Sequence, residues 1–252
     1  MFDLLCALGL ALVGLRFGGT RLAVTLGFAW VAYPFTQYVS SSDTNDALPP
    51  LFLIWGFWLV TSSAARGAAV ALSGWTKFAP LVVGPLWASY PDAFRRPREK
   101  AVFVGAFPAA SLVAFSILLL DGHPLHAAHV FWTRTIGWQL GRDSPFSLWD
   151  WRQYHAGLPD LHLLQRVLEG LLAAGTIAAY FLPRRKSPLQ LAALTAALLL
   201  GFELVLTHWF YLYLPWFFPF AAFAVLAPTL ERAPARAFEP LERPRQELVG
   251  VD

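Results

Sequence analysis

The stretch from residue 67 to residue 90 reads GAAVALSGWTKFAPLVVGPLWASY, and it decides how the chain is arranged. It is apolar enough for one membrane crossing, but the segment from Trp75 to Pro80 interrupts it with a lysine, Lys77, and a helix-breaking proline. Two arrangements fit: a single span, or a hairpin of two half-helices that turns near Lys77. Basic residues decide between them, because they concentrate in the cytoplasmic loops of membrane proteins.

A single span would place either Arg66 or the basic run after Tyr90 outside the cell. The hairpin instead puts every basic cluster on one side of the membrane: Arg16 with Arg21, Arg66, Arg95 to Lys100, and Arg184 to Lys186. The charge pattern therefore favours the hairpin. Non-helical backbone at membrane depth is tolerated only inside protein or beside a water-filled cavity, so the hairpin tip is predicted to line a cavity.

The composition of the whole chain agrees with a membrane protein. Of its 252 residues, 57% are hydrophobic and only 14% are charged, against about 25% charged in an average soluble domain. This excludes intrinsic disorder and collagen-like repeats, and a single cysteine, Cys6, excludes an internal disulfide. The net charge of +3 does not indicate nucleic acid, because the positive residues lie in short runs between apolar stretches.

The apolar stretches predict an all-α protein, a polytopic bundle of about seven transmembrane helices plus the re-entrant half-helix hairpin around Lys77. Residues 1–227 form the integral membrane domain, and residues 228–252, rich in Pro, Arg and Glu, form a flexible cytoplasmic tail. The predicted spans are Phe2 to Leu15, Leu22 to Val39, Pro49 to Thr61, Ala101 to Leu120, Leu163 to Leu182, Leu189 to Thr207 and Tyr211 to Ala227. The Gly18-Gly19 pair is the turn between the first two.

Three polar stretches then face the outside: Ser40 to Ala47, the long loop 121–162, and His208 to Tyr213. Lys77 points towards the same face from the hairpin tip. A lysine within a span is costly and usually faces a pathway or a partner, so Lys77 is a candidate anchor for an anionic group such as phosphate. The alternative is a lysine that snorkels to the interface without a ligand.

The acidic turn before Pro49-Pro50 supplies the candidate catalytic residues, Asp43 and Asp46, with Asn45 between them as a candidate binding residue. Carboxylates and an amide facing a cavity can hold sugar hydroxyls or a divalent cation. The competing interpretation is helix capping, which is the usual role of Asp and Asn at a helix entrance.

The external loop and the last spans supply further candidates. Arg134 and Arg142 can pair with phosphate as planar forks, while Asp143 and Asp150 are candidate structural partners for them. The tryptophans of this loop instead suit a helix at head-group depth; they are Trp132, Trp138, Trp149 and Trp151.

Near the end of the chain, His208 either faces the cavity or belongs to an aromatic belt. Glu203, one turn deeper, requires a cationic partner. His126 and His129 lie three apart, but no third ligand is placed by spacing, so no metal site is predicted.

Several of these segments together resemble a known family. They are the external Asn45-Asp46 turn, Arg66-Gly67, the Ala/Gly-rich half-helix ending in Thr76-Lys77-Phe78-Ala79-Pro80, and the late stretch His208 to Tyr211. The arrangement is similar to the GT-C superfamily of membrane glycosyltransferases, and within it to the mannosyltransferase-like and aminoarabinose-transferase-like branches. The resemblance implies transfer of a sugar from a polyprenyl-phosphate donor to an acceptor on the extracytoplasmic face of a bacterial plasma membrane. It also implies that Lys77 lies near the lipid phosphate.

The chain departs from that family in one respect: no acidic external loop follows the first span. The expected explanations are a missing amino-terminal part, a separate partner chain that supplies it, or a degenerate relative, with Asp43 or Asp46 as substitutes. Two other functions therefore stay open, a non-catalytic membrane scaffold subunit and a transporter of anionic lipids. Broken half-helices are a transporter feature, although the sequence shows no second copy of the Lys77 hairpin.

Overall fold

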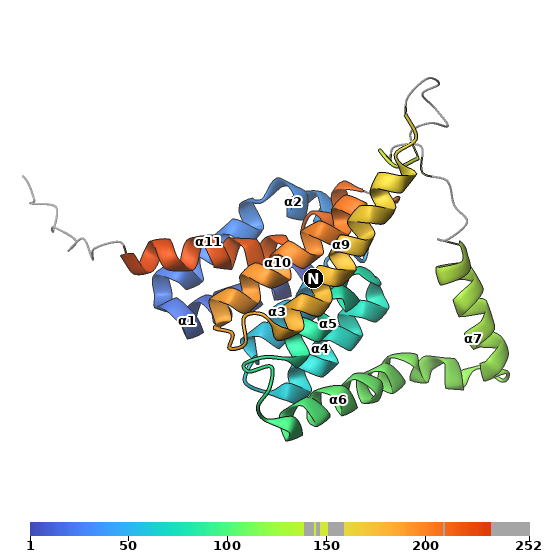
Figure 1. The fold of residues 1–252 in the computed structure, drawn as a ribbon, viewed down its shortest axis with the longest axis horizontal. Coiled ribbons are helices and arrows are strands. Elements are labelled where there is room, and N and C mark those ends of the chain that lie inside the picture. Colours follow the sequence, from blue (N-terminus) through green and yellow to red (C-terminus); the bar gives the residue numbers. More distant parts are fainter. Residues whose placement is uncertain (139–143, 145–146, 151–158, 209, 233–252) are drawn as a thin grey trace, which may run out of the picture.

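The computed structural model describes residues 1–138, 144, 147–150, 159–208 and 210–232, and every regular element in these ranges is a helix. The all-α prediction is confirmed for this part of the chain. Figure 1 shows a helical bundle from which α6 and α7 extend as an arm. In chain order the elements are α1 (Phe2–Ala32), α2 (Pro34–Ser41), α3 (Leu48–Trp58), α4 (Ser63–Thr76), η1 (Ala79–Val83), α5 (Gly84–Ala88), α6 (Pro97–Phe115), η2 (Ser116–Leu120), α7 (Pro124–Trp132), η3 (Thr133–Gly137), α9 (His162–Phe181), α10 (Pro188–Val205), η5 (Tyr211–Tyr213) and α11 (Phe218–Arg232).

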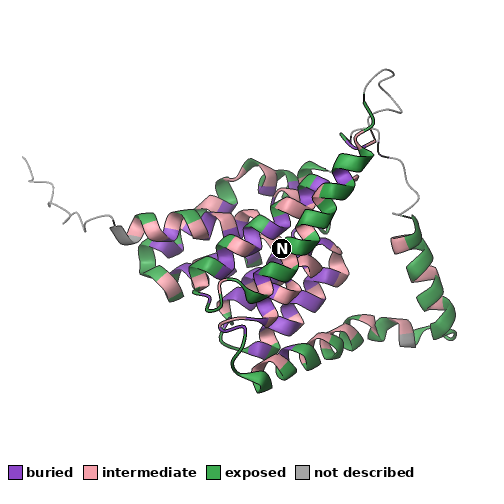
Figure 2. Cartoon of the chain, in the orientation of Figure 1, coloured by how far each residue is buried: buried purple, intermediate pink, exposed green. Residues whose placement is uncertain are grey.

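Three described helices are long and apolar enough to cross a membrane: Phe2–Ala32, Pro97–Leu118 and Pro188–Val205. The shorter apolar helices are Leu48–Trp58, Ala79–Ala88 and Phe218–Leu230. Much of the apolar surface faces outwards, most clearly on α6, where Leu112 and Val113 are 74% and 72% exposed. Figure 2 shows the same predominance of exposed residues along α6 and α7. Such faces require an apolar environment, and a lipid bilayer supplies one.

The first helix, α1, is a hairpin that reverses at Gly19. That glycine has φ +76°, a backbone conformation that L side chains rarely adopt. The two arms approach so closely that a Cβ at Gly14 would meet the backbone of Ala23. The predicted turn at Gly18-Gly19 is therefore present.

The second predicted span, Leu22 to Val39, is shorter than expected. Its helix ends at Ala32, because Tyr33 precedes a proline and is extended (φ −71°, ψ 123°). The separate helix α2 begins at Pro34, and its Thr36 hydroxyl donates to the backbone oxygens of Trp30 and Tyr33.

The hairpin around Lys77 is the organising feature of the centre. Helix α4 begins at the N-cap Ser62, whose hydroxyl accepts from the Ala65 N–H at 3.2 Å, and ends at Lys77, which is extended. The chain then returns through η1 and α5. The two arms meet again at their base, where the Arg66 Nε donates to the Trp87 oxygen at 3.1 Å and a terminal nitrogen donates to the Tyr90 oxygen at 2.9 Å.

Arg66, which the charge pattern places on the same side as the other basic clusters, is therefore a buried link between the two arms. Only 1% of its surface is exposed. Its guanidinium also donates to the Val60 oxygen and to the Ser63 hydroxyl, and it lies over the Tyr90 ring. The guanidinium has five N–H donors in a fixed plane, so one arginine can bind backbone oxygens from two segments at once. The ammonium of a lysine does not have this geometry.

The core that holds this hairpin is largely aliphatic, and it includes aromatic rings from α3, α5 and α11. Phe57 packs edge-on against Phe220 and Phe223, with ring centroids 5.8 and 5.1 Å apart. Trp87 is fully buried, and its Nε1 donates to the Thr195 hydroxyl at 2.9 Å. The last helix, α11, runs through Pro228 to Arg232, so the helical bundle extends past the predicted boundary at residue 227.

The predicted cytoplasmic loops lie together at the base of the bundle. The Ala93 N–H donates to the Arg184 oxygen at 3.0 Å, and the Lys186 N–H donates to the Pro91 oxygen at 2.9 Å. Arg66 joins this end through its bond to Tyr90, and Tyr90 also interacts electrostatically with Arg16. All four basic clusters therefore gather at one end of the molecule.

Candidate functional site

A cavity of about 1050 Å³ lies beyond the tip of the Lys77 hairpin. Its walls come from the end of α4 and η1, from α7 and η3, from α9, and from the segment that follows α10. The lining residues are Trp75, Thr76, Lys77, Phe78, Ala79, Leu81, Val82, Phe131, Arg134, Thr135, Ile136, Trp138, Glu169, Leu172, Ala173, Thr176, Ile177, Phe202, Val205, Leu206, Thr207, His208, Tyr213 and Trp216. The sequence predicted that the hairpin tip lines a cavity, and it does.

Three of the predicted binding residues meet at this cavity although they are far apart in the sequence. Lys77 comes from the hairpin tip, Arg134 from η3, and His208 from the segment after α10. Two of these residues, Lys77 and Arg134, are basic, and the same walls also carry an acidic residue, Glu169. The cavity therefore combines basic and acidic side chains.

Lys77 has a carboxylate partner. Its Nζ lies 3.3 Å from Oδ1 of Asp46, whose side chain is only 3% exposed, and 5.9 Å from the centre of the Tyr213 ring. Lys77 itself keeps 30% of its side chain exposed. Asp46 is predicted as a catalytic residue or a sugar ligand. In the structure it pairs with Lys77, which lines the cavity. An incoming anion has to share or replace this ion pair.

The other residues of the acidic turn do not reach the cavity. Asp43 and Asn45 are exposed and absent from its walls. Asp43 adopts φ +50°, a conformation typical of aspartate in a turn. Neither residue therefore contacts the space that Lys77, Arg134 and His208 line.

The divalent cation considered for the acidic turn does not fit either. Within the described ranges, no three His, Cys, Asp or Glu side chains gather as a metal-ligand group. Asp43 and Asp46 lie in different environments, one in solvent and one beside Lys77. Arg142 and Asp143 lie outside the described residues.

The cavity is amphipathic. Its polar groups stand among aliphatic and aromatic side chains, such as Leu81, Phe131 and Leu172. Two polar atoms on its walls, Thr176 Oγ1 and Trp216 Nε1, are buried and have no hydrogen-bond partner among the described residues. A ligand with both polar groups and an apolar chain would satisfy such a lining.

The sequence reasoning missed Glu169, which lines the cavity from α9. Gln165 stands one turn earlier, and its amide donates to the Val205 oxygen at 2.9 Å and to the Thr207 hydroxyl at 2.8 Å. Gln165 thus ties the segment that carries Thr207 and His208 to α9. A signal for both residues was present, because two polar side chains at i and i+4 share one face of a predicted span.

One further prediction is wrong. Glu203 is 2% exposed, and neither of its carboxyl oxygens has a hydrogen-bond partner in the described part of the chain, so the predicted cationic partner is not there. Trp149, for which an interfacial belt is one interpretation, is 7% exposed and its Nε1 donates to the Leu204 oxygen at 3.1 Å. It packs on the end of α10 because its indole N–H finds a backbone acceptor there.

The cavity can bind an anion through Lys77 and Arg134 and an apolar chain along its aliphatic wall. The Glu169 carboxylate can act as a proton acceptor. In the comparisons with known proteins, no protein-family profile, no curated protein and no solved structure matches this chain. Its function is therefore argued from this cavity.

Proposed function

We propose that the protein is an integral membrane protein with about seven spans, in which the Lys77 hairpin is re-entrant. The placement is supported by the exposed apolar faces of α6 and α9 and by the gathering of basic clusters at one end. Helix α4 has 14 residues, about 21 Å at 1.5 Å per residue, which is too short for a bilayer core of about 30 Å. The basic end then faces the cytoplasm, and the cavity opens towards the opposite face of a bacterial plasma membrane.

Within this placement, the function that the cavity supports best is glycosyl transfer from a polyprenyl-phosphate-linked sugar to an acceptor on the extracytoplasmic face. The observation that carries it is the pairing of Lys77 and Arg134 with an extensive apolar wall in one cavity. Cations placed where a phosphate leaves stabilise the charge that develops on it. The apolar wall is suited to the first units of a polyprenyl chain.

In the proposed step, an acceptor hydroxyl oxygen forms a bond to the anomeric carbon of the sugar. The bond between that carbon and the phosphate oxygen breaks, and the phosphate keeps the electron pair. Lys77 and Arg134 bind the departing phosphate, and the acceptor proton passes to a carboxylate. Among the described carboxylates of the cavity, Glu169 has the placement for this role, and it replaces Asp43 and Asp46 as the candidate base.

A second candidate is an anionic-lipid carrier or a non-catalytic subunit that binds the same lipid without chemistry. The Asp46–Lys77 ion pair favours it, because this pair engages the acidic residue that the sequence predicted as the catalyst. Both candidates require the lipid-phosphate site. They differ in whether the protein transfers the sugar from the bound lipid.

The first test is the binding of a polyprenyl monophosphate to the purified protein in a neutral detergent, across a salt series. We expect saturable binding that weakens at least tenfold in Lys77→Ala, a loss of about 1.4 kcal/mol. Arg166→Ala, which changes an exposed arginine on α9 that does not line the cavity, is the matched control and should bind as wild type. Equal binding by wild type and Lys77→Ala contradicts the site.

The second test separates transfer from carriage. Membranes that contain the protein are given a polyprenyl-phosphate sugar labelled in the sugar, and the label in acceptor products is measured. Transfer that falls at least a hundredfold in Glu169→Gln, with lipid binding retained, supports the enzyme. Binding without any transfer of label supports the carrier or the subunit.

A further inference from the structure

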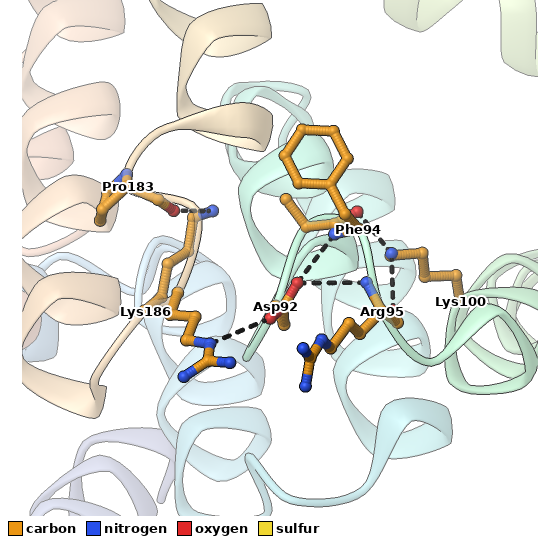
Figure 3. Close-up of polar contacts among 8 residues, drawn as sticks. Asp92, Phe94, Arg95, Lys100, Pro183 and Lys186 are labelled. Atoms are coloured by element: carbon orange, nitrogen blue, oxygen red, sulfur yellow. Dashed lines mark hydrogen bonds and ion pairs between the residues drawn. The ribbon is translucent and has the colours of Figure 1, made fainter.

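The basic end of the molecule is built from two loops that lie far apart in the sequence. Figure 3 shows the loop that carries Asp92, Phe94 and Arg95 beside the loop that carries Pro183 and Lys186. They are joined by two backbone hydrogen bonds, from Ala93 N–H to the Arg184 oxygen and from Lys186 N–H to the Pro91 oxygen. The two loops therefore present one continuous surface.

Part of the charge at this end is used to hold the loops together. Asp92 Oδ1 accepts from the N–H groups of Phe94 and Arg95 at 2.9 and 3.1 Å, and its Oδ2 lies 3.4 Å from Arg185 Nε. These backbone donors and Arg185 hold the pKa of Asp92 below its usual range. The Lys186 ammonium is buried and donates to the oxygens of Tyr180 and Pro183.

Lys100 is half-buried and its ammonium donates to the oxygens of Ala93 and Arg95, whereas the four arginines other than Arg185 are exposed. Residues 91–100 and 182–187 contain seven basic and two acidic side chains, a net charge of +5. Arg95 and Arg98 have no carboxylate within 4.0 Å among the described residues, and the Arg184 guanidinium lies over the Phe94 ring at 5.2 Å. An excess of positive charge thus stands on a loop pair whose backbone is fixed.

Apolar side chains are interleaved with these cations. Phe94 is 59% exposed and Leu182 is 66% exposed, and the Phe94 and Phe181 rings lie 6.0 Å apart. The first loop leads into α6 and the second follows α9. These two helices have exposed apolar faces, so the loops lie where those faces end. Exposed aromatic and aliphatic groups beside basic ones are typical of the boundary between lipid head groups and acyl chains.

We propose that Phe94, Arg95 and Arg184, here called the basic clamp, bind the head group of an anionic phospholipid in the cytoplasmic leaflet. Arginine forks pair with phosphate oxygens in a planar, two-bond geometry. Phe94 enters the acyl boundary beside the head group, and its ring keeps the Arg184 guanidinium in place. The Asp92 carboxylate fixes the loop from below, where it does not face the lipid.

This site is distinct from the cavity. Arg66 marks the basic end, because it donates to the Tyr90 oxygen there. Lys77, at the cavity, follows Arg66 by eleven residues along α4, which separates the two sites by about 16 Å at 1.5 Å per residue. The inference rests on the proposed membrane placement and not on the transfer reaction. Its failure is therefore distinguishable from that of the lipid-phosphate site.

The test uses the full chain in a neutral detergent and native mass spectrometry, with dioleoyl phosphatidylglycerol as the anionic probe and dioleoyl phosphatidylcholine as the zwitterionic one. A basic residue near an anionic surface strengthens attraction about fivefold. Wild type is expected to bind phosphatidylglycerol at least tenfold more tightly than phosphatidylcholine.

The double variant Arg95→Gln/Arg184→Gln should lose that preference. It removes the contact of the Arg184 guanidinium with the Phe94 ring, but no side-chain hydrogen bond or ion pair among the described residues. The joined loops should therefore keep their backbone arrangement while the two charges are lost.

One control makes the result specific. Arg166→Gln removes the same kind of charge from exposed α9 and should keep the preference for phosphatidylglycerol. Unchanged melting temperatures without lipid show that the variants fold.

Three results of the lipid titrations overturn the basic clamp, and one result of a competition experiment does so too. The three are equal binding of the two lipids by wild type, a preference that survives in Arg95→Gln/Arg184→Gln, and a preference lost equally in Arg166→Gln. Displacement of the lipid by an acidic peptide or by RNA, each at equimolar concentration, also overturns it, because the surface would then fit a soluble polyanion better than a head group.

Discussion

Lys77 illustrates how a single residue's role depends on its neighbours. A lysine in an apolar stretch, followed by a proline, is enough to predict a hairpin tip at a cavity. It is not enough to predict the buried carboxylate of Asp46 at 3.3 Å, because that aspartate belongs to a distant turn, the one before α3. The ion pair lowers the net attraction that Lys77 offers to an anion.

Removing the carboxylate should therefore strengthen the binding of an anionic ligand. We expect Asp46→Asn to bind polyprenyl monophosphate about fivefold more tightly than wild type, the equivalent of ~1 kcal/mol for a partly exposed ion pair. The same detergent titration measures it. Asp43→Asn, in the same turn but exposed and away from the cavity, is the control and should bind as wild type. Weaker binding by Asp46→Asn would mean that Asp46 serves to position Lys77.

At the scale of elements, the packing of α6 on α4 depends on one close approach. A Cβ at Gly67 would meet the backbone oxygen of Phe103, which cannot move without moving α6. A Cβ at Gly105, on α6 itself, would meet nothing within 4 Å. The two glycines therefore make a matched pair.

We expect Gly67→Ala to lower stability by about 1–3 kcal/mol through overpacking, and Gly105→Ala to raise it by roughly 0.5–1 kcal/mol, because alanine is the better helix former. Unfolding of both variants in detergent, by heat or by a denaturing detergent, measures the difference. If Gly67→Ala proves as stable as Gly105→Ala, α6 does not approach α4 closely at Gly67 and Phe103.

The two basic-end loops have a pH dependence of their own. Backbone donors of Phe94 and Arg95, together with Arg185, lower the pKa of Asp92 relative to the unfolded chain. A lowered folded-state pKa contributes stability that is fully present above the unfolded value, about 3.9, and that is lost as the pH falls through the folded value.

The melting temperature of wild type should thus approach that of Asp92→Asn as the pH is lowered from 7 towards 3, and should exceed it at neutral pH. The comparison between the two proteins removes the contribution of other carboxylates. A constant difference between them across this range would show that the Asp92 charge does not tie the loops.

At the scale of the whole molecule, the fold predicts opposite sides for two exposed positions. Asn45 lies in the turn before α3, on the side proposed to be external, and Arg98 lies at the basic end; the single cysteine, Cys6, is buried. A membrane-impermeant thiol reagent should label Asn45→Cys in intact cells, but should label Arg98→Cys only after the cells are opened. Wild type is the unlabelled control. Labelling of both variants from one side would contradict the proposed spans.

The amino-acid sequence by itself determined the helical class, the hairpin at Lys77 and the turn at Gly19. These follow from properties that act locally, namely hydropathy, the restricted backbone of proline, the freedom of glycine and the positions of charge. The sequence also identified Lys77, Arg134 and His208 as candidate binding residues on the predicted external side, and all three line the cavity.

Only the tertiary structure decided which side chains pair. Arg66 became a buried tie to the Trp87 and Tyr90 oxygens, Asp46 became the partner of Lys77, and Glu203 was left without the expected cation among the described residues. Glu169 entered the cavity although no motif marked it. The physical reason is that a hydrogen bond or an ion pair requires its atoms to lie within a few ångströms, and segments far apart in the chain reach that distance only through the packing of whole helices.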